Sequence, residues 1–116
     1  MPIVDVTHGS EVGDETLRRL SSLLPHVVSL AVACPEEPYD HALEPGDVDL
    51  RFRVRGPFDS SGLHVVVEVR SKWFASRDVN RQERAEQIHH AIRAEVEPCS
   101  VGVYLSLPVA AWSQNE

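Results

Sequence analysis

A chain of 116 residues has the length of one domain, and we expect a single domain over residues 1–116. Hydrophobic residues make up 42% of the chain and charged residues 25%, a balance that is typical of globular proteins and argues against disorder. The net charge of −7 argues against a nucleic-acid partner, because binding phosphates needs a basic face. The apolar stretches are too short or too interrupted to span a bilayer and no export signal is present, so we expect a cytoplasmic protein without a membrane partner.

The N-terminal part of the chain predicts a strand followed by a helix. β-Branched residues from Pro2 to Thr7 favour a short strand that starts at the N-terminus. Asp14 is a predicted helix N-cap, and apolar residues at helical spacing predict a helix from Glu15 to about Val32. Pro25 lies within this helix, where it removes one backbone donor and should kink the axis.

The next region predicts a loop and then a strand with two different faces. Prolines and acidic residues over 34–46 indicate the loop. From Val48 to Arg55, apolar and charged side chains alternate, which is typical of a strand with one face in the core. The charged face carries Arg51, Arg53 and Arg55. A guanidinium group can bind a carboxylate or stabilise an enolate, but such a face can equally be solvated, as we expect for Arg55 near the strand end.

The C-terminal half of the chain predicts the same types of element again. Leu63–Lys72 alternates as a second long strand, and Trp73–Arg77 is a predicted loop. Asp78 is the predicted N-cap of a second helix, whose apolar stripe continues until Pro98 ends the helix. Ser100–Leu107 is the last predicted strand.

These elements predict an α+β fold of two consecutive βαβ units that form a four-stranded sheet with two helices on one face. This arrangement buries both apolar helix stripes and leaves the other sheet face either solvated or against partner subunits. Ferredoxin-like domains share the same order of elements and have many unrelated activities. The order alone therefore predicts no function.

Proline at position 2 has a chemical consequence. A small residue there permits removal of Met1, which leaves Pro2 with a free secondary amine. An α-amino group titrates at about pH 7.7 to 8.0 in water, and burial or nearby cations lower its pKa by disfavouring the protonated form. Such an amine suits general-base catalysis near neutral pH. If Met1 is retained, Pro2 is an amide and cannot act as a base, and a Met-Pro start is also common without any role.

Several stretches of the chain are characteristic when taken together and in order. They are PIVDV, LSSLLPHVV, DLRFRV, VVVEVRSKWFASRDVNRQERAEQI and SVGVYLSL. The chain resembles the tautomerase superfamily in these stretches, and within it most closely the 5-carboxymethyl-2-hydroxymuconate isomerases. The segment VRSKWFASRD replaces a more glycine-rich one in those isomerases, which changes the expected shape of the pocket.

The resemblance implies a homotrimer with active sites at subunit boundaries and with neither a metal nor an organic cofactor. It implies a tautomerase or isomerase that moves a proton in a small unsaturated 2-keto or 2-hydroxy acid, with the Pro2 amine as general base. Arg51 matches the first arginine of the family's strand motif and Arg77 matches a second arginine position, so both are expected to bind the small carboxylate substrate. Arg53 and then Arg70 are further candidates for substrate binding.

Two other functions remain open at this point. Other branches of the superfamily use the same proline in its protonated form, for hydration, dehalogenation or decarboxylation of small acids. A non-catalytic ferredoxin-like module that binds a small acid or a protein is the second alternative. A metal site is not expected, because His89 and His90 are adjacent and so point in different directions on a helix.

Overall fold

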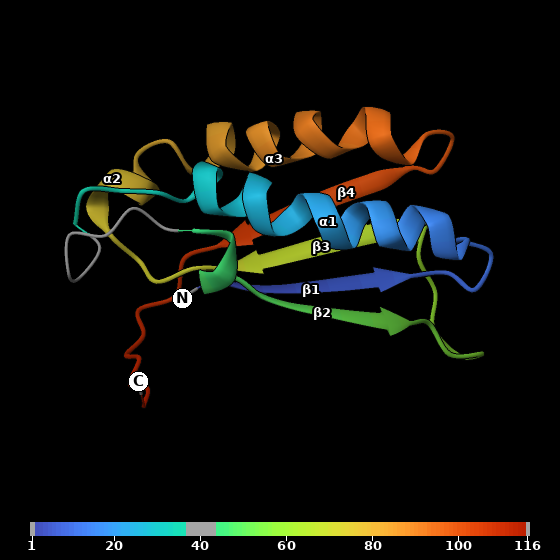
Figure 1. Cartoon of the computed structure of the whole chain (residues 1–116), viewed down its shortest axis with the longest axis horizontal. Helices are drawn as coiled ribbons and strands as arrows, with labels where there is room; N and C mark the ends of the chain where they lie inside the picture. Colours follow the sequence, from blue (N-terminus) through green and yellow to red (C-terminus); the bar gives the residue numbers. More distant parts are fainter. Residues whose placement is uncertain (1, 37–43, 116) are drawn as a thin grey trace.

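The computed structural model describes residues 2–36 and 44–115, and it shows one sheet with two long helices lying across one of its faces (Figure 1). The strands are β1 (Ile3–His8), β2 (Asp49–Val54), β3 (Val65–Arg70) and β4 (Val101–Ser106). The helices are α1 (Asp14–Ala31), the short α2 (Ala75–Asp78) and α3 (Arg81–Val96), and a 3-10 turn, η2 (Pro45–Asp47), precedes β2. The predicted α+β fold is confirmed.

The four strands form a mixed sheet in the order β2-β1-β3-β4. β1 runs parallel to β2 and antiparallel to β3, and β3 runs parallel to β4. Asp5 of β1 therefore has Arg51 of β2 on one side and Glu68 of β3 on the other. The two crossover helices lie on the same face, and the opposite face carries no element among the described residues.

The core lies between the covered face of the sheet and the two long helices. Alternate residues of the central strands form the sheet side of the core, as the period of two along a strand requires. Those that are fully buried are Val4, Val6, Val65, Val67 and Val69. Residues at helical spacing form the helix side of the core, and the fully buried ones are Leu20, Leu24, Val28, Ile88 and Ile92. The predicted apolar stripes of both helices are confirmed by this packing.

The predicted inward face of β2 is wrong for its second half. Leu50 packs against the core, but Phe52 is 37% exposed and Val54 is 54% exposed. β2 is an edge strand, and an open cleft lies between its Phe52 and the first half of α1, so this helix does not close over the second half of the strand. Alternation in a sequence shows which side chains share a face, but it does not show how far the covering helix extends.

The predicted helix starts also differ from the structure. The N-cap of α1 is Gly13, which makes no side-chain capping bond, and Asp14 is already the first helical residue. Asp78 ends α2, a helix in the region predicted as a loop, and Asn80 is the N-cap of α3. Pro25 lies inside α1 as predicted. None of the helices in residues 2–36 and 44–115 combines the length and apolar character needed to cross a bilayer.

Candidate functional site

Pro2 lies immediately before β1, at the end of the sheet where β2 begins and where β3 and β4 end. The residue is buried, and its carbonyl oxygen accepts a hydrogen bond from the backbone N–H of Asp49 at 2.9 Å. The N–H and C=O positions of one strand residue point to the same side, so the Pro2 nitrogen also faces β2. The pairing of β1 with β2 therefore fixes the position of the proline at this end of the sheet.

Ser71 lies across from Pro2 on the other side of β1. The antiparallel ladder ends with the pair Ile3 and Arg70, and extending its register by one residue places Ser71 opposite Pro2. The Ser71 backbone N–H is turned away toward β4, where it donates to the Ser106 carbonyl at 3.1 Å. The Ser71 side chain is buried, and its hydroxyl has no hydrogen-bond partner in the described part of the chain. A buried hydroxyl without a partner among the described residues therefore lies at the same end of the sheet as Pro2.

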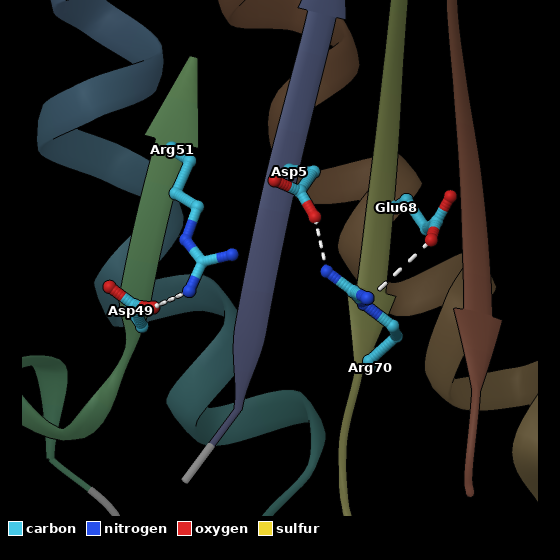
Figure 2. A network of polar contacts seen from close by, with 5 residues as sticks. All are labelled: Asp5, Asp49, Arg51, Glu68 and Arg70. Atoms are coloured by element: carbon cyan, nitrogen blue, oxygen red, sulfur yellow. Dashed lines mark hydrogen bonds and ion pairs between the residues drawn. The ribbon is translucent and has the colours of Figure 1, made fainter. Parts of the chain in front are cut away.

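Arg51 lies on the uncovered face of β2, and its guanidinium turns back toward the beginning of that strand (Figure 2). Its Nη2 binds the Asp49 carboxylate at 2.6 Å. Arg51 is level with Asp5, about 7 Å further along the sheet than Ile3 at about 3.3 Å per residue. The side chain is therefore directed toward the Pro2 end of the sheet, but a carboxylate of its own chain already holds it.

Arg70 lies on the same uncovered face at the end of β3. Figure 2 shows its guanidinium reaching across to Asp5 of β1, with which it forms an ion pair, while its Nε lies 3.8 Å from the Glu68 carboxylate. The Arg70 Nε itself is buried without a hydrogen bond among the described residues. Arg51 and Arg70 thus belong to a row of alternating charges across β2, β1 and β3.

Arg53, a candidate for substrate binding, and Arg55, which was expected to be solvated, lie further along β2 from the Pro2 end of the sheet than Arg51. Arg53 is exposed, lies level with Thr7 and makes no hydrogen bond or ion pair within the described residues. At about 3.3 Å per residue, Thr7 is about 13 Å further along the sheet than Ile3, so Arg53 cannot reach Pro2 of its own chain. Arg55 donates to the His64 carbonyl at 3.4 Å. The predicted arginines are therefore not all brought together.

Arg77 is fully buried, and its hydrogen bonds place it at the end of the sheet where β3 ends. Its Nε donates to the Val32 carbonyl just after α1 at 2.6 Å, and its Nη1 donates to the Lys72 carbonyl just after β3 at 2.7 Å. A cation at a helix C-terminus is stabilised by the negative end of the helix dipole. Arg77 therefore joins the end of α1 to the segment that follows β3.

Arg84, which the sequence did not single out, forms hydrogen bonds in the same corner of the fold, where the residues after α1 meet the segment that follows β3. Its Nη1 donates to the Ala31 and Ala33 carbonyls, each at 2.9 Å, and its Nη2 donates to the Ser76 carbonyl at 3.2 Å. The guanidinium reaches these atoms from the first turn of α3. Sequence offered no signal for this role, because the carbonyls that Arg84 binds are distant in the chain.

The segment after β3 holds a second residue that the sequence did not indicate as part of the site. Lys72 is half-buried, and its Nζ lies 5.6 Å from the centroid of the Phe74 ring. The Arg77 Cζ lies 5.2 Å from the same centroid. Two cations therefore converge on one aromatic ring, an arrangement that the ring quadrupole favours. The available sequence signal was that Lys72 is the only lysine of the chain.

The carboxylate of Glu36 lies close to this corner. The Ser76 hydroxyl and the Ser76 backbone N–H both donate to it, the latter at 3.3 Å. The hydrogen bond from the Ser76 hydroxyl lowers the pKa of Glu36, and the charge of Arg77 adds to the same direction. Glu36 is therefore held as an anion by Ser76 rather than by a direct ion pair with Lys72.

Two surface clefts lie away from Pro2. A cleft of about 600 Å³ lies between the beginning of α3 and β4, and a smaller one of about 310 Å³ lies between α1 and Phe52. Neither is lined by Pro2. No group of three or more His, Cys, Asp or Glu side chains in the described ranges is arranged to hold a metal ion.

No protein-family model matches this sequence, and no curated protein matches it. Solved structures do match the fold. A fused 4-OT symmetric trimer aligns with a TM-score of 0.62 at 14% identity, over 92% of this chain and 85% of that one. Malonate semialdehyde decarboxylase, for which decarboxylase and hydratase activities are described, aligns with a TM-score of 0.66 at 13% identity, over 98% and 91%. A 5-carboxymethyl-2-hydroxymuconate delta-isomerase aligns with a TM-score of 0.53 at 14% identity, over 100% and 87%.

Proposed function

We propose that this protein is a cofactor-free tautomerase or isomerase that moves a proton within a small unsaturated 2-keto or 2-hydroxy acid. The observation that carries the proposal is the position of Pro2, buried at the beginning of β1 and fixed by its bond with Asp49. The fold shared with an isomerase and with a decarboxylase supports it, although at 13–14% identity the likeness does not distinguish between these activities.

The proposed chemistry needs the secondary amine that loss of Met1 would leave on Pro2. A buried amine loses hydration of its charged form, which lowers its pKa and leaves the nitrogen free to accept a proton near neutral pH. The amine takes a proton from the carbon next to the carbonyl, or from the hydroxyl of a 2-hydroxy dienoate, and delivers it to a carbon of the conjugated system. The substrate is rearranged without any net gain or loss of atoms, so the reaction requires no redox partner.

The arginines have different parts in this proposal. Arg51 and Arg70 lie nearest to the level of Pro2 and stabilise the negative charge of substrate and enolate from the uncovered face. Arg77 is engaged with two backbone carbonyls and holds the corner after β3. Arg53 is too far from Pro2 of its own chain and acts only at the site of a neighbouring subunit. These assignments go together with a homotrimer whose sites lie at subunit boundaries. The trimeric 4-OT structure, which has a similar fold, is a precedent for such an assembly.

Hydration or decarboxylation of a small acid is the second candidate function. The likeness to malonate semialdehyde decarboxylase favours it, because that protein matches 98% of this chain with a TM-score of 0.66. In this chemistry Pro2 acts in its protonated form. The two candidates therefore differ in pH dependence: activity that needs the free amine rises as the pH passes its pKa, and activity that needs the protonated amine falls.

The test is to compare the natural N-terminus with a variant in which one glycine is inserted between Met1 and Pro2. The insertion converts the Pro2 nitrogen into an amide while leaving every other residue in place. We expect mass spectrometry to show that Met1 is lost from the natural protein. Ketonisation of phenylenolpyruvate or 2-hydroxymuconate should fall by about 10² to 10⁴ in kcat/KM on insertion, which is the usual contribution of a general base.

The possible outcomes separate the candidates. Retention of Met1 by the natural protein, or full activity of the insertion variant, contradicts proline catalysis. Decarboxylated or hydrated products from small acids, lost on insertion, establish the second candidate. Saturable binding of a small acid without turnover, unchanged by insertion, identifies a ferredoxin-like binding module instead.

A further inference from the structure

The turn that follows β2 presents one aromatic side chain to solvent. Pro57 and Phe58 are its central residues, and the Asp59 N–H closes it by donating to the Gly56 carbonyl at 3.1 Å. The Asp59 carboxylate accepts the Gly56 N–H at 2.7 Å, and a proline at the second position of a turn has its φ already set. Phe58 is 98% exposed. The chain therefore holds a large apolar side chain in water on a fixed turn, which lowers the entropy cost of docking it.

The cleft beside β2 is complementary to such a side chain. It lies between the first half of α1 and Phe52, has a volume of about 310 Å³, and has Leu17 and Phe52 as its apolar lining. Ser21 also lines it and is exposed. The volume is large enough for one aromatic side chain, which would there contact the Phe52 ring. Phe58 does not occupy the cleft of its own chain, because its side chain is almost entirely exposed.

The charged groups beside the turn and the cleft complement each other. Arg18 lines the cleft and makes no hydrogen bond or ion pair in the part of the chain that the structure describes. Asp14, one helical turn earlier, is the other charged residue of the lining, and no ion pair joins it to Arg18 within the described residues. Asp59 follows Phe58, and its bond within the turn uses only Oδ2. An aromatic ring from this turn is thus accompanied by a carboxylate that matches the arginine of the cleft.

The turn and the cleft lie at the same end of the molecule (Figure 1). β1 and β2 run parallel and both end there, α1 begins there, and the turn follows β2 directly. A two-fold axis at this end therefore brings the turn of each of two copies toward the cleft of the other. A two-fold contact requires such mutual complementarity of one surface.

We propose that two copies of this chain associate through a reciprocal contact at this end. Phe58 of each copy occupies the cleft between α1 and Phe52 of the other, and Asp59 pairs with Arg18 across the contact. The inference goes beyond the proposed function and does not depend on it, because the contact leaves the Pro2 end of the sheet free. It doubles the number of subunits in the assembly that the chain forms without it.

The first test removes the aromatic anchor. Phe58→Ser changes a side chain that contacts almost nothing in its own chain, so the fold is retained, which circular dichroism verifies. Sedimentation equilibrium should show half the particle mass of the unaltered chain and a dissociation constant raised by at least about a hundredfold, because a two-fold contact loses its anchor twice. Val79→Ser removes another strongly exposed apolar side chain and should leave the mass unchanged. Equal masses of the unaltered chain and Phe58→Ser at every concentration overturn the inference.

The second test fills the cleft. Ser21→Trp introduces a bulky ring into its lining, whereas Ser22→Trp places the same ring at the next position of α1, which is exposed but does not line the cleft. We expect Ser21→Trp to halve the particle mass and Ser22→Trp to leave it unchanged. A mass that falls with Phe58→Ser but not with Ser21→Trp shows that Phe58 docks on another surface, and this result overturns the proposed contact.

The third test is a double-mutant cycle of Asp59→Asn and Arg18→Gln. The amide oxygen of asparagine still accepts the Gly56 N–H, so the turn is kept while the charge is removed. Each substitution should raise the dissociation constant of the contact about tenfold, and the double variant should bind no more weakly than either single one. Arg93→Gln, which removes an exposed charge from α3, is the control and should have no effect. Additive losses show that the two groups do not meet and overturn the reciprocal contact.

Discussion

Two groups of arginines in this molecule illustrate how differently the same side chain can be used. Arg51 and Arg70 lie on the uncovered sheet face and pair with the carboxylates of Asp49 and Asp5 (Figure 2). Arg77 lies inside the protein and donates to backbone carbonyls at the end of α1. A partly exposed ion pair is screened by water and contributes little, whereas a buried guanidinium must be satisfied throughout. The first group can therefore vary with little effect on folding, and the second cannot.

The largest expected effect follows from removing the buried guanidinium. Arg77→Met leaves the Val32 and Lys72 carbonyls without their present donor, and we expect a loss of about 3 kcal/mol in the free energy of unfolding. Urea denaturation of the variant measures this loss. Arg93→Met, which removes a charge from the exposed face of α3, is the control and should change stability by less than about 0.5 kcal/mol. Equal stability of the two variants would show that the buried guanidinium contributes no more to the free energy of unfolding than an exposed one.

A smaller effect is expected on the uncovered face. In a double-mutant cycle of Asp5→Asn and Arg70→Gln, we expect a coupling free energy of about 1 kcal/mol or less, decreasing as salt is added. Denaturation at low and high ionic strength measures the coupling. A salt-insensitive coupling well above this range would contradict a water-screened pair, and sedimentation of the same samples then shows whether the face is buried between subunits.

The smallest effect concerns the exposed carboxylate beside the buried corner. The Ser76 hydroxyl lowers the pKa of Glu36 in the folded chain relative to its unfolded value. The stabilisation by this contact is therefore present above the unfolded pKa and is lost as the pH falls through the folded pKa. Ser76→Ala should move the Glu36 pKa back up toward the ordinary glutamate value. A carboxyl NMR titration of both proteins measures the shift, and an unchanged pKa would exclude Ser76 as its cause.

Much of the fold follows from pattern, and less of the candidate site does. Alternation predicted the strands to within a few residues, and helical spacing predicted α1 and α3, because burial of one face imposes these periods. The short helix α2 was not predicted, since its place depends on the burial of Arg77 against a distant carbonyl of Val32. Arg84 and Lys72 were missed for a related reason. Their surroundings come from elements that the chain brings together only on folding.

The sequence by itself determined the order of the elements, the α+β class and the presence of proline at the start of the first strand. These depend on local periodicity and on residue type, both of which can be read along the chain. Only the tertiary structure decided which cations are neutralised, how much of β2 is covered and that the Ser71 hydroxyl is buried at the Pro2 end of the sheet. Such features depend on the register between strands and on contacts between distant segments, because electrostatic pairing and burial act through space rather than along the sequence.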